Sequence, residues 1–298
     1  MMKTVVMRLN GGMGNQMFQY AFAKALAERY DATLELDTSV FDLPYVREAY
    51  RLDEFGIRPR FSSTWRNQFH RLLLSPRFPR PLRRLIVRLA GIKIVDRVKS
   101  VDGSQRTTLL VGYFQHPVFF ANAIHALRKD FELPIAGAPA EACLDRIISE
   151  VSVAVHVRRG DYVEVPLFRD TLGVLSAEYY RKAIAEMRHR VPGARFFFFT
   201  NDPDWVERAL LATMTDGELV RIGSGCNDTT ELALMRACTH FIVGNSTFSW
   251  WPAYLSEAHE KTVIAPSPWF RCGDVADEDL VLPSWITCGS IWEAGSDC

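Results

Sequence analysis

The amino-acid sequence predicts a two-domain α/β protein built from doubly wound parallel sheets. The chain has 298 residues, of which 48% are hydrophobic and 23% charged, which is enough for two cores of ordinary composition. Short apolar runs typical of buried strands recur along the chain, and stretches with helical spacing of apolar residues separate them. Strands separated by helices form parallel sheets with helices packed on them.

The first series of elements begins at the N-terminus. The runs "KTVVMRL" (residues 3–9), "TLELD" (33–37) and "LLVGYF" (109–114) predict strands. Helices are predicted over residues 16–29 and 118–130.

The second series begins near Val151, after the Pro- and Gly-containing stretch at residues 132–142. We therefore predict an N-terminal domain over 1–150 and a C-terminal domain over 151–298. The C-terminal strands are predicted in "VAVHV", "ARFFFFT", "HFIVGN" and "TVIAP", and the helices over residues 177–190, 205–213, 230–238 and 248–256.

Composition excludes several classes of function. The formal net charge is zero, so no overall field attracts nucleic acid or a membrane. The N-terminus is too short and too charged for a signal peptide, and no apolar run reaches the length of a membrane span. The six cysteines lack metal-binding spacing, which favours reduced thiols in a cytoplasmic protein, with a disulfide near the C-terminus as the alternative.

The stretch "HVRRGDY" (residues 156–162) places charged side chains at the exit of a predicted buried strand. Ligands of open α/β sheets bind at the carboxyl ends of strands, where Arg158, Arg159 and Asp161 fall. Successive strand residues point to opposite faces, so the two arginines should have different roles. The planar guanidinium favours a phosphate or diphosphate clamp, and a structural arginine–aspartate bridge is the alternative.

Two further loops follow predicted strands. In "NSTFSWW" (residues 245–251), the polar residues Asn245, Ser246 and Thr247 either cap a helix or offer hydroxyls and N–H groups to an anion. In "NGGMGNQ" (residues 10–16), the glycines do not complete a dinucleotide or P-loop motif. Asn15 and Gln16 there suit a sugar hydroxyl, or they cap the following helix.

The string Asp202-Pro203-Asp204 is similar to the metal-binding DxD sites that hold manganese on a nucleotide-sugar. Proline after Asp202 is also typical of a helix start, with the aspartate as its cap. Because two arginines can neutralise a diphosphate, we expect neither a metal nor a cofactor.

Residues 65–99 form a basic segment. Leu82, Leu85, Ile86 and Leu89 recur there at helical spacing. Such a basic amphipathic helix either contacts an anionic membrane surface peripherally or is an ordinary solvated helix. The cationic residues stand against Asp96 alone and are Arg66, Arg71, Arg77, Arg80, Arg83, Arg84, Arg88, Lys93, Arg97 and Lys99.

Four motifs together resemble the α-1,2-fucosyltransferase family: "GGMGNQMFQYA" (11–21), "HVRRGDY" (156–162), "FFTND" (198–202) and "ELALMRACTHFIVGNSTFSWWPAYL" (231–255). The resemblance implies a GT-B architecture of two Rossmann-like domains facing a cleft. It implies inverting, metal-independent transfer of L-fucose from GDP-β-L-fucose to the 2-hydroxyl of a terminal galactose on a glycan. The alternatives are an enzyme of the same fold with another nucleotide-sugar donor and a non-catalytic glycan-binding protein. A setting in cell-surface polysaccharide assembly would follow.

The resemblance also implies roles for single residues. Arg158 would contact the β-phosphate, with Arg159 and Asp161 supporting the site, and either Asp161 or Glu164 would serve as general base. Asn15 and Gln16 would face the acceptor. The expected donor-binding residues are His156, Asn201, Asp202, Glu231, Asn245, Ser246, Thr247, Phe248 and Ser249, although family members often carry aspartate at the place of Glu231.

Overall fold

The computed structural model describes residues 2–96, 104–135, 137–222, 228–272 and 280–293. These residues form two compact units, Met1–Phe131 and Glu132–Cys298. Arg97 and Lys99 of the basic segment, and two of the six cysteines, lie outside the described residues.

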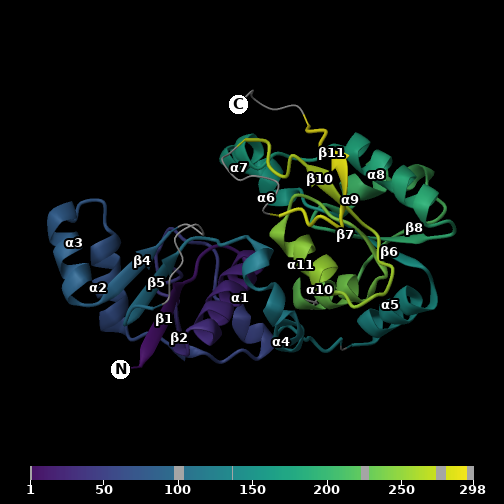
Figure 1. The fold of residues 1–298 in the computed structure, drawn as a ribbon. Helices are drawn as coiled ribbons and strands as arrows, with labels where there is room; N and C mark the ends of the chain where they lie inside the picture. Colours follow the sequence, from purple (N-terminus) through teal and green to yellow (C-terminus); the bar gives the residue numbers. More distant parts are fainter. Residues whose placement is uncertain (1, 97–103, 136, 223–227, 273–279, 294–298) are drawn as a thin grey trace. The chain divides into compact units, whose positions relative to one another are not determined.

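The first unit contains a five-stranded parallel sheet in the order β3-β2-β1-β5-β4 (Figure 1). Its central strand is buried because Val5, Val6 and Met7 are all apolar, and α1 packs on β1 and β2 through a largely buried surface. The strands are β1 (Lys3–Arg8), β2 (Ala32–Asp37), β3 (Arg60–Phe61), β4 (Ile92–Val95) and β5 (Thr107–Val111). The helices are α1 (Met13–Arg29), α2 (Thr64–Leu74), α3 (Arg80–Leu89) and α4 (Ile124–Asp130), with 3₁₀ turns η1 (Leu52–Phe55), η3 (Pro117–Phe119) and η4 (Ala121–Ala123).

The second unit contains a six-stranded parallel sheet in the order β11-β10-β9-β6-β7-β8. The strands are β6 (Ser152–Val157), β7 (Arg195–Thr200), β8 (Gly217–Leu219), β9 (His240–Ile242), β10 (Val263–Ser267) and β11 (Ile286–Gly289). The helices are α5 (Ala138–Ser149), α6 (Gly160–Glu164), α7 (Pro166–Thr171), α8 (Ala177–Arg190), α9 (Pro203–Ala209), α10 (Asp228–Ala237) and α11 (Thr247–Leu255), with the 3₁₀ turn η5 (Leu211–Thr213).

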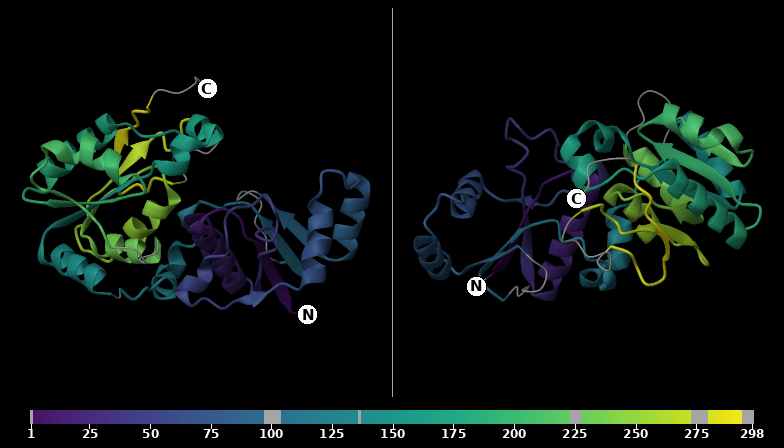
Figure 2. Two further views of the ribbon diagram at one scale, coloured as in Figure 1. Left: turned by 180° about the vertical axis from the view of Figure 1, so that it is seen from behind. Right: turned by 90° about the horizontal axis from the view of Figure 1, so that it is seen from above.

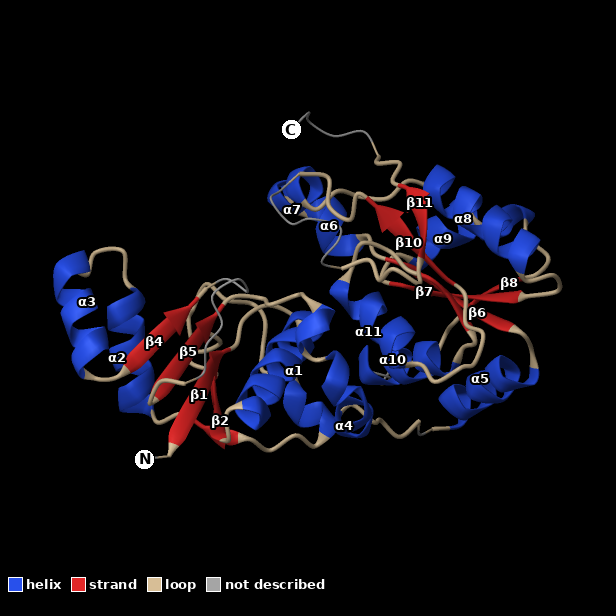
Figure 3. Ribbon diagram, in the orientation of Figure 1, coloured by secondary structure: helices blue, strands red, loops and turns tan. Residues whose placement is uncertain are grey.

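Helices cover both faces of this second sheet, as Figures 2 and 3 show. Val153, Val155 and Val157 share one core with α8, and the alternate residue His156 lies against the ring of Phe248 in α11. The period of two along β6 therefore sends odd-numbered residues towards α8 and even-numbered residues towards α11.

The predicted strands are confirmed, and α8 has the predicted bounds. The predicted helix over 118–130 is instead two 3₁₀ turns followed by α4. The structure divides the chain between Phe131 and Glu132, earlier than the predicted boundary at 150, because α5 packs against α10 of the second unit. Cys272 is disulfide-bonded, whereas Cys143, Cys238 and Cys288 are free thiols, so the general expectation of reduced thiols is wrong at Cys272.

Across the described part of the chain, none of the helices is both long and apolar enough to cross a bilayer.

Candidate active site

The second sheet reverses its strand order between β6 and β9. Chain order runs outward from β6 through β7 and β8 on one side and from β9 through β10 and β11 on the other, which is the strand order of dinucleotide-binding folds. Ligands of such sheets bind beyond the carboxyl ends of the two strands that flank the reversal. The loops that follow β6 and β9 therefore form the candidate site, and they carry the "HVRRGDY" and "NSTFSWW" motifs.

These two loops are in direct contact. The hydroxyl of Tyr162 donates a hydrogen bond to the carbonyl oxygen of Asn245 at 3.3 Å. A Cβ atom at Gly244 would lie 3.0 Å from the carbonyl oxygen of His156 and 3.2 Å from the hydroxyl of Tyr180. Glycine at 244 thus lets the two strand ends approach closely.

Arg158 is the half-exposed arginine of the pair. Its side chain is 34% exposed, its Nη2 lies 2.9 Å from a carboxylate oxygen of Asp161, and its guanidinium carbon lies 5.7 Å from the centre of the Tyr162 ring. The ion pair with Asp161 is itself half-exposed, so it contributes little to stability. Arg158 thus presents a permanent positive charge at the switch point.

Arg159 is buried and points to the opposite face. Its Nε donates to Asp202 at 3.0 Å, its Nη1 donates to Glu293 at 2.5 Å, and its guanidinium lies 4.1 Å from the centre of the Trp205 ring. The two arginines have different surroundings, and their different roles stay a prediction. Internal partners surround the guanidinium of Arg159.

The backbone between the arginines and α6 is also fixed. The N–H of Arg159 donates to Oδ1 of Asn201 at 2.9 Å, and Gly160 has a φ of +21°. A Cβ at Gly160 would lie 2.3 Å from Nδ2 of Asn201. Asn201 therefore supports the loop from the end of β7, a position different from the expected direct contact with the donor.

The carboxylates of the DxD-like string have structural partners. Asp202 accepts the N–H of Trp205 as the cap of α9 and accepts Nε of Arg159, while Asp204 is exposed in the first turn. Helix capping was one of the two interpretations open from the sequence, and it is the one observed. Within the described ranges, no group of three or more histidine, cysteine, aspartate or glutamate side chains is arranged to hold a metal ion.

Two titratable groups lie near Arg158 on its face of the sheet. Burial, together with the charge of Arg158, lowers the pKa of His156 to about 3, so its imidazole is neutral. Burial and the nearby carboxylate of Asp228 raise the pKa of Glu231 to about 7, although Arg158 opposes this rise. In the described part of the chain Nδ1 of His156 has no hydrogen-bond partner.

The polar residues after β9 divide into two groups. The amide of Asn245 donates to the carbonyl oxygens of Leu172 and Gly173, Ser246 caps α11, and the hydroxyl of Ser249 donates to backbone carbonyls. Each of these three side chains is buried and bonded within the protein, and their contact with the donor stays a prediction. Thr247 and Phe248, in the first turn of α11, are half-exposed.

The two candidate general bases differ in surroundings. Asp161 is half-exposed and paired with Arg158, whereas Glu164 is exposed at the end of α6. Asp161 is thus the carboxylate held beside the cation, and Glu164 lies further along the helix.

In the first unit β1 and β5 are adjacent parallel strands, so the loops that follow them begin side by side. There Asn15 accepts a hydrogen bond from Nε2 of Gln115 at 2.8 Å, which joins the start of α1 to the loop after β5. Gln16 is fully buried, donates to the carbonyl oxygens of Gly11 and Ala49, and accepts the N–H of Arg51. The amide of Gln16 thus links the turn before α1 to residues 49 and 51, and its contact with an acceptor stays a prediction.

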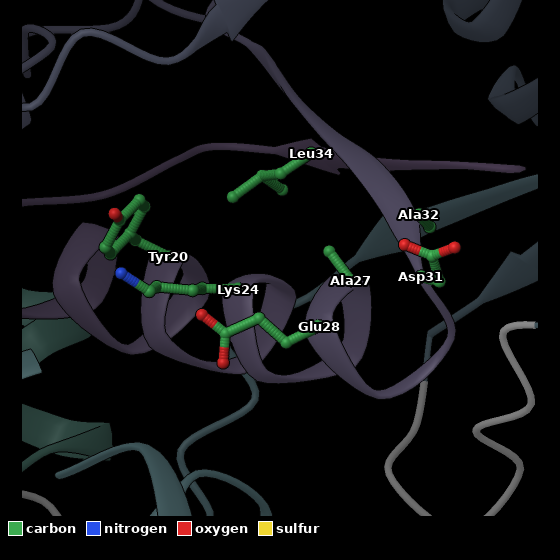
Figure 4. Close-up of a pocket in the computed structure, with 7 residues that line it drawn as sticks. All are labelled: Tyr20, Lys24, Ala27, Glu28, Asp31, Ala32 and Leu34. Carbon is green, nitrogen blue, oxygen red and sulfur yellow. The ribbon is translucent and has the colours of Figure 1, made fainter. Parts of the chain in front are cut away.

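A cavity of about 350 Å³ lies beside α1 and the start of β2 (Figure 4). Tyr20, Lys24 and Glu28 line it from the helix, and Ala32 and Leu34 line it from the strand. The ammonium group of Lys24 is paired with Asp130. Because Ala32 is the first residue of β2, the cavity extends to the amino end of the strands of the first sheet, whereas Asn15 and Gln115 follow the carboxyl ends of β1 and β5.

Sequence reasoning missed several residues of the site. Glu293 lies in a tail that matched no motif, so nothing in the sequence connected it with Arg159. Tyr162 stands inside the "HVRRGDY" motif, where its link to Asn245 was not foreseen. Gln115 follows the predicted strand at 109–114, and that position at a strand end was the signal that could have identified it.

The chain was compared with known proteins. The pattern of the family described as "Glycosyl transferase family 11" matches residues 2–288. The alpha-1,2-colitosyltransferase of Escherichia coli is 28% identical over 293 residues, which cover 96% of this chain and 99% of that protein. The galactoside alpha-(1,2)-fucosyltransferase 1 of Leontocebus fuscicollis is 34% identical over 104 residues, covering 35% of this chain and 28% of that protein.

One solved structure supports the fold. A mutant of FUT1 of Arabidopsis thaliana in complex with GDP superimposes with a TM-score of 0.53 at 12% identity, covering 91% of this chain and 72% of that one. At this identity the likeness concerns the fold alone, and it agrees with two parallel α/β sheets.

Proposed function

We propose that this chain, which belongs to glycosyl transferase family 11, transfers L-fucose from GDP-β-L-fucose to the 2-hydroxyl of a terminal galactose on a glycan. Its two units would be the domains of a GT-B-type enzyme, with the donor bound by the second unit and the acceptor by the first. The reaction inverts the anomeric configuration and uses neither a metal nor a cofactor.

The observation that carries this proposal is the position of Arg158 at the reversal between β6 and β9. Such sheets bind nucleotides beyond the ends of the two strands at the reversal. The half-exposed guanidinium of Arg158 follows one of these strands, β6, and the first turn of α11 follows the other, β9. Both groups suit a diphosphate, since one is a cationic fork and the other is a helix N-terminus.

The chemistry follows from charge development. As the bond between C1 of fucose and the phosphate oxygen breaks, the sugar becomes oxocarbenium-like and the β-phosphate gains negative charge. Arg158 stabilises that charge in the transition state, a kind of interaction worth about 10²–10³ in rate. The acceptor oxygen attacks C1 from the opposite side and loses its proton, for which Asp161 and Glu164 are the candidate bases.

Arg159, Asn201, Asp202 and Glu293 are positioning residues in this proposal. They hold the backbone after β6, so Arg158 projects from a fixed turn. His156 and Glu231 would line the nucleotide pocket on the same face as Arg158. The acceptor would contact Asn15, in the first turn of α1 in the first unit.

The proposal is tested with GDP, UDP and ADP in thermal-shift measurements, followed by transfer from GDP-fucose to galactose-terminated glycans. GDP alone should raise the midpoint appreciably, because only a ligand that binds the folded state stabilises it. Fucose should appear on the 2-hydroxyl of galactose, and EDTA should leave the rate unchanged. Stabilisation by UDP instead of GDP, or loss of turnover in EDTA, would contradict the proposal.

A second donor is favoured by one observation, the full-length similarity to an alpha-1,2-colitosyltransferase. Colitose is fucose without its 3-hydroxyl, so the two donors differ by one polar group. Parallel transfer assays with GDP-fucose and GDP-colitose separate the candidates. A preference for GDP-colitose would move the assignment to that donor and leave the diphosphate chemistry unchanged.

We further propose that the protein acts in the cytoplasm, in the assembly of a cell-surface polysaccharide. Fractionation of cells that express the protein tests this location directly.

A further inference from the structure

The helices α2 and α3 carry a surface that the proposed transfer reaction does not use. They lie side by side (Figures 1 and 2), with α3 against the edge strand β4 and the first turn of α2 paired with Glu35 of β2. Between Thr64 and Asp96 the sequence has eight arginine and lysine side chains and one carboxylate, although the whole chain has a formal net charge of zero. Positive charge is therefore concentrated at this edge of the unit.

Most of these cations are not neutralised by the protein. Arg66 pairs with Glu35, and Arg83 donates to the carbonyl oxygen of Leu73. Five others are exposed and have no ion-pair partner among the described residues, and they are Arg71, Arg77, Arg80, Arg84 and Arg88. Internal ion pairing therefore does not account for them.

An apolar stripe runs beside these arginines along α3. Leu82, Leu85 and Leu89 are 46%, 53% and 78% exposed, and their spacing of three and four residues places them on one helix face. Arg84 and Arg88 lie on the adjoining face of the same helix. On α2, Trp65 and Leu72 form a second exposed pair at seven-residue spacing.

We propose that this surface, formed by α2 and α3 and called here the α2–α3 surface, binds an anionic lipid bilayer. A helix with leucines on one side and arginines beside them inserts its apolar residues at the headgroup boundary, while the guanidiniums contact phosphates. A second copy of this chain is a poor partner, because pairing would bring two arginine rows together. Nucleic acid would use the arginines and leave the leucines exposed to water.

The surface would hold the enzyme at the membrane on which a lipid-linked glycan is assembled. This placement rests on the proposed function, whereas bilayer binding itself does not.

Flotation of the full-length protein with vesicles tests the proposal. Vesicles of phosphatidylcholine alone are compared with vesicles that also contain phosphatidylglycerol, at about 0.05 M and about 0.5 M salt. We expect binding only to the anionic vesicles, and loss of binding at high salt. Equal binding to neutral vesicles, or no binding at low salt, would overturn the proposal.

Three variants separate this surface from general charge effects. Replacing Arg80, Arg84 and Arg88 by glutamine should weaken partitioning by about fivefold per arginine, roughly a hundredfold together. Replacing Leu82, Leu85 and Leu89 by alanine should weaken binding while the residual binding stays salt-sensitive. The matched control replaces Arg181, Lys182 and Arg190, on the solvent-facing side of α8, by glutamine; it removes the same charge and should bind normally.

The outcomes are distinct from those of the transfer assay. Both α3 variants should transfer sugar to a soluble acceptor at the parental rate, because neither changes a residue of the candidate site. An equal loss of vesicle binding in the α8 control would show that binding depends on total charge and would refute the proposed role of the α2–α3 surface. A parental dimer that dissociates in the leucine variant, without vesicle binding, would assign the stripe to self-association and reject the bilayer.

Discussion

At the scale of single residues, the adjacent Arg158 and Arg159 have different surroundings because successive residues of a strand point to opposite faces of the sheet. Arg159 continues the odd-numbered side of β6 and meets Trp205, Asp202 and Glu293. Arg158 continues the even-numbered side, where Glu231 is near enough for its charge to affect that carboxyl. A buried arginine with two carboxylate partners fixes geometry, and a half-exposed one is available to a ligand.

Arg158→Ala should lower kcat/KM by about 10²–10³ because the leaving diphosphate loses its cationic partner. The free energy of unfolding should change by less than about 1 kcal/mol, since a half-exposed ion pair contributes little. Steady-state kinetics and denaturant unfolding measure the two quantities. Arg181→Ala on α8 is the control and should change neither, and near-parental turnover by Arg158→Ala would refute the phosphate role.

Glu231 should make GDP affinity depend on pH. Its pKa of about 7 leaves the carboxyl largely protonated at pH 6, and an ionised carboxylate is needed to accept N–H groups of a nucleobase. GDP should therefore bind more tightly as the pH rises from 6 to 8. Calorimetric titration should show a steeper dependence in the parent than in Glu231→Gln, in which only the ionisation of the terminal phosphate of GDP remains.

The ionisation of Glu231 should also make the free energy of unfolding depend on pH, and this free energy should fall as the pH rises. Because folding raises this pKa from its usual 4.5, the stabilisation from protonated Glu231 is complete below pH 4.5 and is lost as the pH passes about 7. The unfolding free energy of Glu231→Gln relative to the parent should thus rise by up to about 3 kcal/mol over that interval. Glu164→Gln, at an exposed position, should show no such trend.

At the scale of elements, the central strands were predictable and the sheet edges were not. "VAVHV" and "FFFF" are continuous apolar runs because β6 and β7 are buried on both faces. β3, with two exposed residues, and β8, with three half-buried ones, leave no such pattern. The candidate site was likewise only partly predictable. Its turns carry sequence motifs, whereas Glu293 is far from Arg159 in the sequence and contacts it only in the folded chain.

The turn between β6 and α6 should require glycine. Gly160→Ala places a Cβ at 2.3 Å from Nδ2 of Asn201, whose Oδ1 holds the N–H of Arg159. We expect a destabilisation of about 1–2 kcal/mol and at least a tenfold loss of activity, measured by thermal unfolding and transfer assays. Gly289→Ala in β11, where a Cβ meets nothing within 4 Å, should leave both nearly unchanged.

At the scale of the whole molecule, each unit has its own parallel sheet, and the two strand orders differ. The second sheet runs outward in chain order on both sides of the β6–β9 pair, whereas the first, β3-β2-β1-β5-β4, has β5 beside β1 and β4 at the edge. The division at Phe131 and Glu132 keeps the two sheets in separate units. In the proposed transfer reaction, each unit would bind one of the two substrates.

Hydrogen exchange should distinguish these positions. GDP should slow amide exchange in the loops after β6 and β9 and in the first turn of α11, because bound ligand suppresses local opening there. The loops after β1 and β5 should respond instead to a galactose-terminated acceptor. Protection of the first unit by GDP alone would contradict the assignment of the donor to the second.

The carboxylate of Asp161 beside Arg158 has a consequence for ligand choice. Because this carboxylate lies 2.9 Å from the guanidinium of Arg158, an incoming anion has to displace it. A ligand with little negative charge gains little free energy from that exchange. A nucleoside diphosphate carries more negative charge than a monophosphate and competes better. The Arg158–Asp161 pair would therefore favour GDP over GMP through the charge of the ligand alone, independently of contacts with the base or the sugar.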